Sequence, residues 1–412
     1  MQSCTHLIVG ASHAGLTALS AIRMNEPDAA IVMATREDHL PYSPTVLPYV
    51  VSGRSDPAKV TLRSESFFDE NKVSYLRKAT LLALDTGANT AHFPDGRSIR
   101  YEKLLLATGA SPNIPPIPGL KDVPFHVLRT MDDALGLKKA MVKGKRALVL
   151  GAGLIGTHAA ENMAEAGMKV TIVEARGQVL PGYFDHQASG IIETAFKAHG
   201  IELVFGRAVK EIKSGQALLE NGDAIPFDLL LVATGVRPDL SYLQGSGVKS
   251  DGGILVDELQ RTNISNVWAA GDCARARLFQ SEATGIAGIL PIAVEQGRIV
   301  GQAMTDDAGV RNFPGSVSLN TYTFFGQQAI SVGAGEAPES ETSLCVDEDR
   351  NTYLKIVIKD GRLMGAAAVN QALDPGILWQ LVLRRTDLSE VREAFLADPK
   401  TISRMLMSRI WR

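Results

Sequence analysis

One stretch, from Ala147 to Glu174 (ALVLGAGLIGTHAAENMAEAGMKVTIVE), constrains the fold more than any other part of this sequence. It predicts a buried strand over 147–150, a glycine turn, a helix that runs to about Ala166, and a second strand over 170–173. Gly167 is typical of the end of a helix. An acid follows about 20 residues beyond the glycines, so the whole context of a dinucleotide-binding unit is present rather than an isolated glycine motif.

Each of the three glycines has a separate physical task in such a turn. Gly151 permits the tight turn, Gly153 lets a pyrophosphate approach the backbone, and Gly156 lets the helix pack closely against the strand. The helix N-terminus presents unpaired N–H groups and a partial positive charge to the phosphates. Glu174 would accept hydrogen bonds from the adenosine ribose and so favours NAD, a preference that Arg176 weakens.

The N-terminus repeats this plan. Apolar strands over 5–9 and 30–34 flank the turn GASHAG, which runs from Gly10 to Gly15, and a helix. Ser12 takes the place of the middle glycine, where its side chain could crowd a pyrophosphate. Glu37 is the nearest acid for a ribose, and its alternative interpretation is a solvated loop charge.

The duplication continues downstream of both turns. HFPDGRSIRYEKLLLATGASP and LLENGDAIPFDLLLVATGVRP share a strand, an Asp-Gly or Asn-Gly hairpin turn, a second strand, an apolar run and the motif ATG-x-x-P. We therefore expect Thr108 and Gly109 to lie beside one dinucleotide, and Thr234 and Gly235 to lie beside the other.

Chain order predicts that one dinucleotide-binding domain is inserted into the other. The expected FAD-binding domain contains residues 1–120 and 245–314, and the expected NAD-binding domain contains residues 121–244. Asp272 in the motif GDCA could bind the ribityl chain of a flavin, or it could cap a helix. Residues 315–412 change character and predict a C-terminal α+β domain with an antiparallel sheet and a terminal helical pair.

Composition excludes several classes of function. A net charge of −3 gives no reason to expect a nucleic acid or an anionic membrane as a partner. No apolar run approaches the ~18 residues of a membrane-spanning helix, and we expect a cytoplasmic protein without membrane insertion. Cys4, Cys273 and Cys345 stand far apart, which excludes a local redox dithiol and argues against an iron-sulfur cluster held by this chain alone.

Five motifs in this order and spacing resemble those of the pyridine nucleotide-disulfide oxidoreductases: VGASHAG, ATGASP, GAGLIG with Glu174, ATGVRP and GDCA. The resemblance covers the whole chain and implies an α/β fold with two Rossmann-like domains, one inserted in the other, and a C-terminal interface domain. It implies FAD and NAD(H) as cofactors. The residues implied for FAD are Gly10, Gly15, Glu37, Arg129 and Asp272, and those implied for NAD are Gly151, Gly153, Gly156 and Glu174.

A narrower resemblance rests on PYSPTVLPYVVSGR, LNTYTFFGQQAISVG, LRRTDL and the terminus MSRIWR. These segments are similar to those of the FAD-containing epsilon subunits of NADH-dependent phenylglyoxylate dehydrogenases, and the flavoprotein subunits of tungsten-containing aldehyde oxidoreductases are a related possibility. Both groups imply a subunit of a larger complex that exchanges electrons with an iron-sulfur partner.

Two positions depart from the pattern of the wider family. Coenzyme A-disulfide reductases carry a cysteine before an L-P-Y motif, but here the segment is Pro44-Thr45-Val46-Leu47-Pro48-Tyr49, which disfavours thiol chemistry. Many relatives place a glutamate two residues after the last glycine of the NAD motif, where this chain has His158. That histidine could donate to reduced flavin or gate nicotinamide entry, or it could be a packing histidine.

The sequence therefore predicts an FAD-dependent NAD(H) oxidoreductase that transfers a hydride between nicotinamide and flavin N5. With no second redox group in the chain, the electrons would pass singly to an external carrier in a complex that oxidises 2-oxoacids or aldehydes. One alternative is a stand-alone NADH oxidase or an NADH-dependent ferredoxin or quinone reductase. Another is a non-catalytic flavoprotein that assembles in response to NADH.

Overall fold

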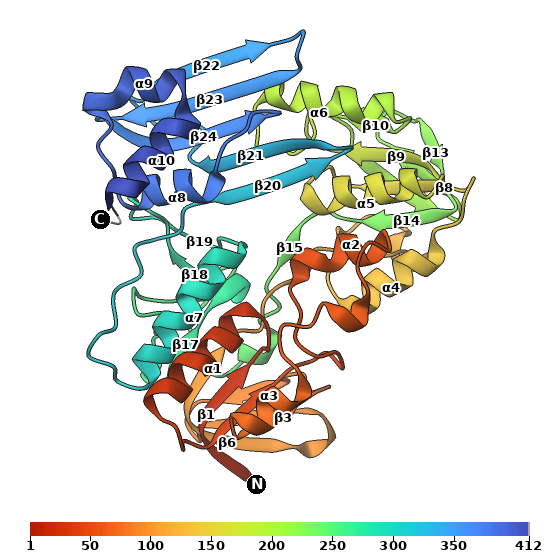
Figure 1. The fold of residues 1–412 in the computed structure, drawn as a ribbon. Helices are drawn as coiled ribbons and strands as arrows, with labels where there is room; N and C mark the ends of the chain where they lie inside the picture. Colours follow the sequence, from red (N-terminus) through yellow and green to blue (C-terminus); the bar gives the residue numbers. More distant parts are fainter. Residues whose placement is uncertain (411–412) are drawn as a thin grey trace. The chain divides into compact units, whose positions relative to one another are not determined.

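A computed structural model of the chain describes residues 1–410 as two compact units, each built from several segments (Figure 1). The first contains residues 1–47, 55–111 and 236–316, and the second contains residues 48–54, 112–235 and the chain from 317 onward. The predicted α/β class with an antiparallel C-terminal sheet is confirmed. The three functional domains stay a prediction. Trp411 and Arg412, which end the MSRIWR motif, lie outside the described residues.

The first unit is built on one sheet in the order β3-β2-β1-β6-β5-β4, with β17 paired to β6. Its strands are β1 (Gln2–Val9), β2 (Ile31–Ala34), β3 (Val73–Leu76), β4 (Ala83–Asp85), β5 (Thr90–His92), β6 (Ser98–Leu106) and β17 (Val267–Ala269). Strands β3, β2, β1, β6 and β17 are parallel, and β4 and β5 extend the sheet as an antiparallel hairpin. The ends of the parallel strands therefore meet at one edge, where a nucleotide site of this fold type forms.

Helices cover this sheet because its central strand is apolar on both faces. Leu7 and Val9 of β1 belong to one buried cluster, and Ile8 between them belongs to the other. Helices α1 (His13–Asn25) and α7 (Leu290–Met304) pack against each other so closely that a Cβ on Gly297 would lie 2.3 Å from the carbonyl oxygen of Ala14. The glycine in α7 is thus required by helix packing.

The first unit also contains several short elements. They are α3 (Glu65–Glu70), β16 (Ile254–Leu255), β18 (Ala274–Arg277), β19 (Thr284–Gly285) and the 3₁₀ helices η1 (Pro44–Val46) and η6 (Gly271–Cys273). Helix α2 (Leu47–Val51) begins the segment that belongs to the second unit.

The second unit contains a parallel sheet in the order β10-β9-β8-β14. Its strands are β8 (Arg146–Leu150), β9 (Lys169–Glu174), β10 (Glu202–Phe205) and β14 (Leu229–Val232), and its helices are α4 (Met131–Ala140), α5 (Leu154–Glu165) and α6 (His186–Ala198). A three-stranded antiparallel sheet of β11 (Val209–Lys213), β12 (Gln216–Leu219) and β13 (Ala224–Pro226) packs through Ile212, Ala217 and Leu219 into the same core. The strand, turn, helix and strand expected over 147–174 are thus confirmed.

The C-terminal part of the second unit is a five-stranded antiparallel sheet in the order β20-β21-β24-β23-β22. Its strands are β20 (Leu319–Phe324), β21 (Gln327–Gly333), β22 (Glu341–Asp347), β23 (Thr352–Lys359) and β24 (Arg362–Val369). Three helices follow, α8 (Pro375–Leu383), α9 (Arg392–Ala397) and α10 (Pro399–Ile410). The helical pair expected around Leu378 to Leu396 corresponds to α8 and α9, and α10 was not predicted. Pro399 occupies the first turn of α10, where a missing N–H costs nothing.

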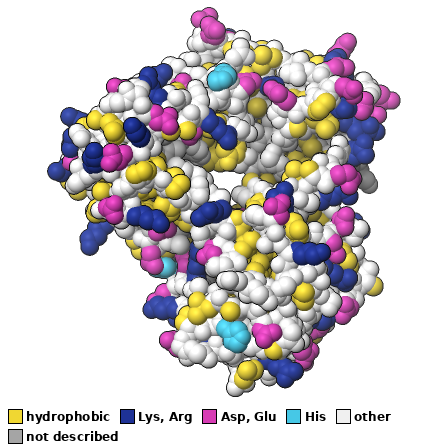
Figure 2. Space-filling model, turned by 180° about the vertical axis from the view of Figure 1, so that it is seen from behind, with side chains coloured by type: hydrophobic (Ala, Val, Ile, Leu, Met, Phe, Trp, Pro, Cys, Tyr) yellow, Lys and Arg dark blue, Asp and Glu magenta, His cyan; other side chains and the backbone are white. Residues whose placement is uncertain are grey.

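Two observations bear on the expected environment of the chain. Over residues 1–410, no helix combines the length and the apolar character that crossing a membrane requires. Figure 2 shows acidic and basic side chains interspersed over most of the face that it presents.

Candidate functional site

The N-terminal glycine turn lies between the end of β1 and α1 in the first unit (Figure 1). Gly10 has φ +118°, and a Cβ there would lie 2.0 Å from the carbonyl oxygen of Ala107. A Cβ on Gly15 would lie 1.9 Å from the carbonyl oxygen of Gly10. Ser12 is the N-cap residue of α1, yet its side chain makes no capping hydrogen bond. The turn therefore leaves the first N–H groups of the helix without a side-chain acceptor.

The first ATG motif lies next to this turn. Thr108 and Gly109 directly follow Ala107, whose carbonyl oxygen lies so near Gly10 that a Cβ there would be 2.0 Å from it. The hydroxyls of Thr108 and Tyr242 are hydrogen-bonded at 2.9 Å, and Gly109 has φ +70°. The structure thus brings the predicted residues Thr108 and Gly109 to the turn that holds Gly10.

Glu37 follows β2, the strand beside β1. The buried Tyr42 donates its hydroxyl to Oε2 of Glu37 at 2.6 Å, which fixes the carboxylate. The neighbouring Arg36 is instead directed to the hydroxyl of Ser111, at 3.1 Å. The acid is thus a held group at a strand end rather than a freely solvated loop charge.

Asp272 lies on η6, directly after β17. Its neighbour Gly271 donates its N–H to the side chain of Gln296 at 2.8 Å, and a Cβ on Gly271 would lie 3.4 Å from the Cβ of Ala14. Asp272 therefore stands near the start of α1, together with the other predicted FAD residues of this unit.

Arg129 is the exception among the residues predicted for FAD. It belongs to the second unit, where it precedes Thr130, the N-cap of α4, and its N–H bonds to Asp133. The structure does not place Arg129 with Gly10 and Asp272 inside one unit, so its assignment remains a prediction from the resemblance.

The second glycine turn lies between β8 and α5. A Cβ on Gly151 would lie 2.4 Å from the carbonyl oxygen of Ala233, and one on Gly156 would lie 2.0 Å from the carbonyl oxygen of Gly151. Nothing lies within 4 Å of a Cβ on Gly153, the N-cap residue of α5. Two of the glycines are therefore required by the fold itself, whereas the space over the third is open.

Glu174 and Gly235 lie at the same edge of the second sheet. Oε2 of Glu174 accepts the N–H of Ala152 at 2.8 Å, and Oε1 accepts the N–H of Arg176 at 2.9 Å. Each oxygen keeps a further lone pair that a ribose hydroxyl can use. Gly235 has φ +92° and follows Thr234, whose hydroxyl donates to the carbonyl oxygen of Asn113.

Both turns fit the pyrophosphate of a dinucleotide. Neither α1 nor α5 has a side-chain cap or an acid in its first turn, whereas α4 and α6 are capped by Thr130 and Asp185. Uncapped N–H groups at a helix N-terminus without nearby carboxylates form an anion site. The two helices that begin at glycine turns are thus open to an anion, although α7 and α8 also lack a side-chain cap and an acid in the first turn.

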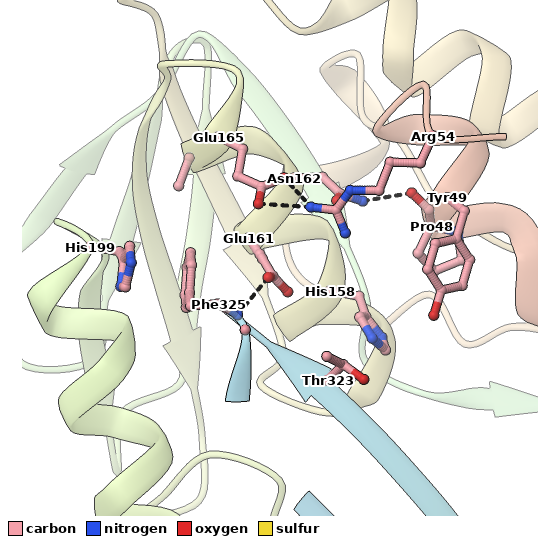
Figure 3. A pocket seen from close by; sticks show the side chains of 12 residues that line it. Pro48, Tyr49, Arg54, His158, Glu161, Asn162, Glu165, His199, Thr323 and Phe325 are labelled. Atoms are coloured by element: carbon pink, nitrogen blue, oxygen red, sulfur yellow. Dashed lines mark hydrogen bonds and ion pairs between the residues drawn. The ribbon is translucent and has the colours of Figure 1, made fainter. Parts of the chain in front are cut away.

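His158 lies in a cavity of about 570 Å³ in the second unit (Figure 3). The walls come from residues 48–54, from α5 and from the turn between β20 and β21. The ring of His158 packs edge-on against the ring of Tyr322, with centroids 4.6 Å apart. Burial lowers the pKa of His158 to about 4, and a hydrogen bond to the Leu154 carbonyl opposes that shift. The ring is therefore neutral at pH 7, and it can donate only as a neutral imidazole.

The same cavity contains residues that the sequence analysis missed. Glu161 and Asn162 of α5 are each only 6% exposed, and Asn162 donates to the Pro48 carbonyl at 2.8 Å. Arg54 forms two hydrogen bonds, of 2.8 and 2.7 Å, to the carboxylate of Glu165. The spacing of His158, Glu161 and Glu165 on one helix face was the available signal.

Comparisons with known proteins agree with this geometry. Residues 5–297 match the family described as Pyridine nucleotide-disulphide oxidoreductase, and residues 319–374 match the Rubredoxin NAD+ reductase C-terminal domain. The chain belongs to the pyridine nucleotide-disulphide oxidoreductase family. As a member of this family it is an FAD-dependent NAD(H) oxidoreductase.

Three relatives illustrate the range of this similarity. The chain is 51% identical to the NADH-dependent phenylglyoxylate dehydrogenase subunit epsilon of Aromatoleum evansii, over 100% of this chain and 99% of that protein. It is 30% identical to a rubredoxin-NAD(+) reductase of Pseudomonas putida, over 66% of this chain and 72% of that protein. The solved NAD-dependent persulfide reductase from A. fulgidus is 26% identical with a TM-score of 0.85, covering 94% of this chain and 78% of that chain.

Proposed function

We propose that this protein is the FAD-containing subunit that passes electrons between iron-sulfur clusters of a partner oxidoreductase and NAD. The partner would oxidise a 2-oxoacid or an aldehyde. The observation that carries this proposal is the 51% identity, over the full length of both chains, to a protein named as a subunit of an NADH-dependent phenylglyoxylate dehydrogenase. The match to a rubredoxin NAD+ reductase C-terminal domain is consistent with a protein electron carrier.

The three cysteines form no redox-active pair, which supports the proposal that electrons pass to an external carrier. Cys4, Cys273 and Cys345 are all free, and burial raises the pKa of Cys4 to about 12 and raises that of Cys273. Two residues before the L-P-Y segment the chain has Thr45, whose hydroxyl is hydrogen-bonded to that of Ser43 at 2.7 Å. Within residues 1–410 no group of three or more His, Cys, Asp or Glu side chains could hold a metal ion. Free thiols are also typical of a reducing compartment, which supports the cytoplasm as the proposed location.

In the proposed mechanism the chain binds, orients and shields its cofactors. When bound, FAD supplies hydride exchange with nicotinamide at flavin N5 and single-electron exchange with the partner. The turn containing Gly10, Ser12 and Gly15 would hold the FAD pyrophosphate. Glu37 would bind its ribose, and Asp272 would bind its ribityl chain.

The second turn would hold NAD in the same way. Gly151, Gly153 and Gly156 would accommodate its pyrophosphate, and Glu174 would accept hydrogen bonds from the adenosine ribose. No residue needs to abstract a proton from an organic substrate, because that oxidation would take place in the partner. The chain's contribution is therefore orientation and the exclusion of water.

Anaerobic titration of the FAD-loaded protein with NADH tests the proposal. We expect one equivalent of NADH to bleach the flavin absorbance, and unchanged absorbance would contradict NADH as the hydride donor. Copurification of the native protein, followed by iron analysis of what accompanies it, tests the partner. Purification of the protein alone, with full turnover and no iron, would argue against an iron-sulfur partner.

A stand-alone NADH oxidase is a second candidate, because the chain is 31% identical over 72% of its length to a protein named NADH oxidase in Methanocaldococcus jannaschii. An NADH-dependent ferredoxin or quinone reductase would share its independence from a larger complex. Rapid NADH oxidation in air by the isolated protein would favour the oxidase. Slow oxidation in air that a ferredoxin or rubredoxin accelerates would favour a reductase with a protein carrier.

A further inference from the structure

A buried carboxylate lies in the wall of the cavity that contains His158. Glu161 is only 6% exposed, and its Oε1 accepts the N–H of Phe325 at 2.7 Å (Figure 3). Among the described residues no donor bonds to Oε2. Oε2 is not enclosed by protein atoms, and Glu161 lines the cavity, so this oxygen is available to a group that enters the cavity.

The turn that contacts Glu161 is held in a strained conformation. Phe325 has φ +45° and Gly326 has φ +77°, and together they connect β20 to β21. Two-residue turns of this kind favour Asn or Gly at the first position, because an aromatic side chain is crowded at positive φ. The N–H bond to Glu161 and the stacking of the Phe325 ring on His199, at 3.8 Å and 7°, hold it there. The turn therefore fixes the position of the Phe325 ring in the wall of the cavity.

The charges around Glu161 do not balance. Glu161 and Glu165 lie one turn apart on α5, and Arg54 is bonded by both of its contacts to Glu165. His158 is neutral at pH 7 because burial lowers its pKa to about 4. When Glu161 is ionised, the cavity therefore carries one negative charge without a partner. Burial raises the pKa of Glu161, and the charge of Glu165 adds to that shift.

We propose that this cavity binds a small organic cation with N–H donors, such as a guanidinium or ammonium compound, anchored on Glu161. The free oxygen of Glu161 accepts the N–H groups, and the rings of Phe325 and Tyr49 provide aromatic surface of the kind that attracts cations. The volume of about 570 Å³ lies in the range of small-molecule sites. The exposed pair of Arg54 and Glu165 lines the same cavity and adds no net charge.

Calorimetric titration of the full-length, FAD-loaded protein without NADH tests this site independently of the proposed function. Methylguanidinium is the probe, and methylurea is its matched control, because it has a similar shape and N–H donors but no charge. Tetramethylammonium has the charge but no N–H. We expect saturable binding of methylguanidinium and at least tenfold weaker binding of both controls. Equal binding of methylurea, or no saturable binding of methylguanidinium, would overturn the proposal.

Two variants locate the probe. Glu161→Gln keeps an acceptor for the Phe325 N–H and so keeps the turn, and we expect it to weaken methylguanidinium binding at least tenfold. Glu348→Gln removes the same charge from an exposed loop outside the cavity and should leave binding unchanged. Phe325→Asn suits positive φ and removes the ring, so the fold should be retained while binding weakens about threefold. Wild-type affinity in Glu161→Gln would refute the assignment of Glu161.

Binding should also weaken as the pH is lowered. The cation favours the ionised form of Glu161, whose pKa is raised by burial and by Glu165 and is lowered by the Phe325 N–H, Arg54 and His199. Proton uptake below that raised pKa removes the anchoring charge. We expect affinity to fall at least fivefold per pH unit on the acidic side in the wild type and to stay level in Glu161→Gln. A fall of the same size in both proteins would show that another group is responsible.

Discussion

The two glycine turns have the same steric requirements at their first and last glycines but differ at their middle residue. In each turn the first glycine has a positive φ, and a Cβ on it would strike a backbone carbonyl oxygen, that of Ala107 at 2.0 Å for Gly10 and that of Ala233 at 2.4 Å for Gly151. In each, a Cβ on the last glycine would strike the carbonyl oxygen of the first, at 1.9 Å for Gly15 and 2.0 Å for Gly156. The middle residue is Ser12 in one turn and Gly153 in the other.

This difference separates what the fold requires from what a ligand requires. Ser12 (φ −99°, ψ −159°) and Gly153 (φ −76°, ψ −178°) both have extended backbones that any residue adopts. Neither position therefore needs glycine for its own conformation, and the space over Gly153 is empty of protein atoms. The outer glycines allow the strand and the helix to pack closely, and the identity of the middle residue can follow the requirements of the bound group.

The strongest test of the shared constraint is an alanine at the last glycine of each turn. Gly156→Ala and Gly15→Ala each place a methyl group against a backbone oxygen that cannot move, so we expect each to lower the free energy of unfolding by about 3 kcal/mol. Urea denaturation measures the loss. Gly190→Ala, in α6 with nothing within 4 Å of the new Cβ, is the matched control and should be neutral or slightly stabilising. A wild-type transition in Gly156→Ala would mean that the helix and strand are not held this closely.

A second difference between the copies is a titratable residue on the helix. His158 lies two residues after the last glycine of the second turn, where the first turn has Thr17. The pKa of His158 is lowered to about 4 from its usual 6.5, so the unfolded chain binds a proton first as the pH falls. As the pH falls from about 6.5 to about 4, His158 therefore lowers the free energy of unfolding by about 3 kcal/mol in total. His158→Gln should lack this contribution, so its stability relative to the wild type should rise as the pH falls.

Unfolding curves of both proteins at several pH values measure that difference, and Thr17→Ser is the control in the other turn. A constant difference between wild type and His158→Gln from pH 7 to pH 4 would contradict the lowered pKa. The catalytic assignment needs a separate measurement. If His158→Ala leaves the hydride-transfer rate and its pH profile unchanged, His158 is a packing residue.

Most of this architecture could be predicted because its signals are local. Apolar runs beside glycines specify β1, α1, β8, α5 and β9. The cavity could not be predicted, because Arg54, Glu161 and Phe325 come from segments more than a hundred residues apart. The lowered pKa of His158 has the same origin, since its burial depends on packing against Tyr322 of β20.

Three aromatic residues at the end of β20 and in the turn after it have different environments. Tyr322 and Phe324 are buried, at 1% and 0% exposure, but Phe325 lies in the wall of the cavity. Strand alternation explains the first two, and the turn explains the third. A positive φ at an aromatic residue has no signature in the sequence, because Asn or Gly would be expected there.

Placing serine, the middle residue of the first turn, at Gly153 in the second turn should have a smaller effect. Gly153→Ser should leave the fold intact because its Cβ meets no protein atom. If the pyrophosphate of NAD lies over this position, the added side chain should weaken NAD binding by about 1–3 kcal/mol, which is roughly 5- to 150-fold. Fluorescence titration with NADH measures the affinity, and an unchanged urea transition is the control. Unchanged affinity would place the pyrophosphate elsewhere.

The reverse exchange, Ser12→Gly, should have the smallest effect. The Ser12 side chain makes no capping hydrogen bond, so its removal deprives α1 of no acceptor, and glycine at an N-cap costs only a few tenths of a kcal/mol. If the FAD pyrophosphate is accommodated beside Ser12 rather than crowded by it, the FAD affinity should stay within about threefold. Equilibrium dialysis of FAD against both proteins measures this. A gain of tenfold or more would show that Ser12 crowds the cofactor, and a loss of that size would show that its hydroxyl donates to the phosphate. Either result would make the middle residue a determinant of the first nucleotide site as well as the second.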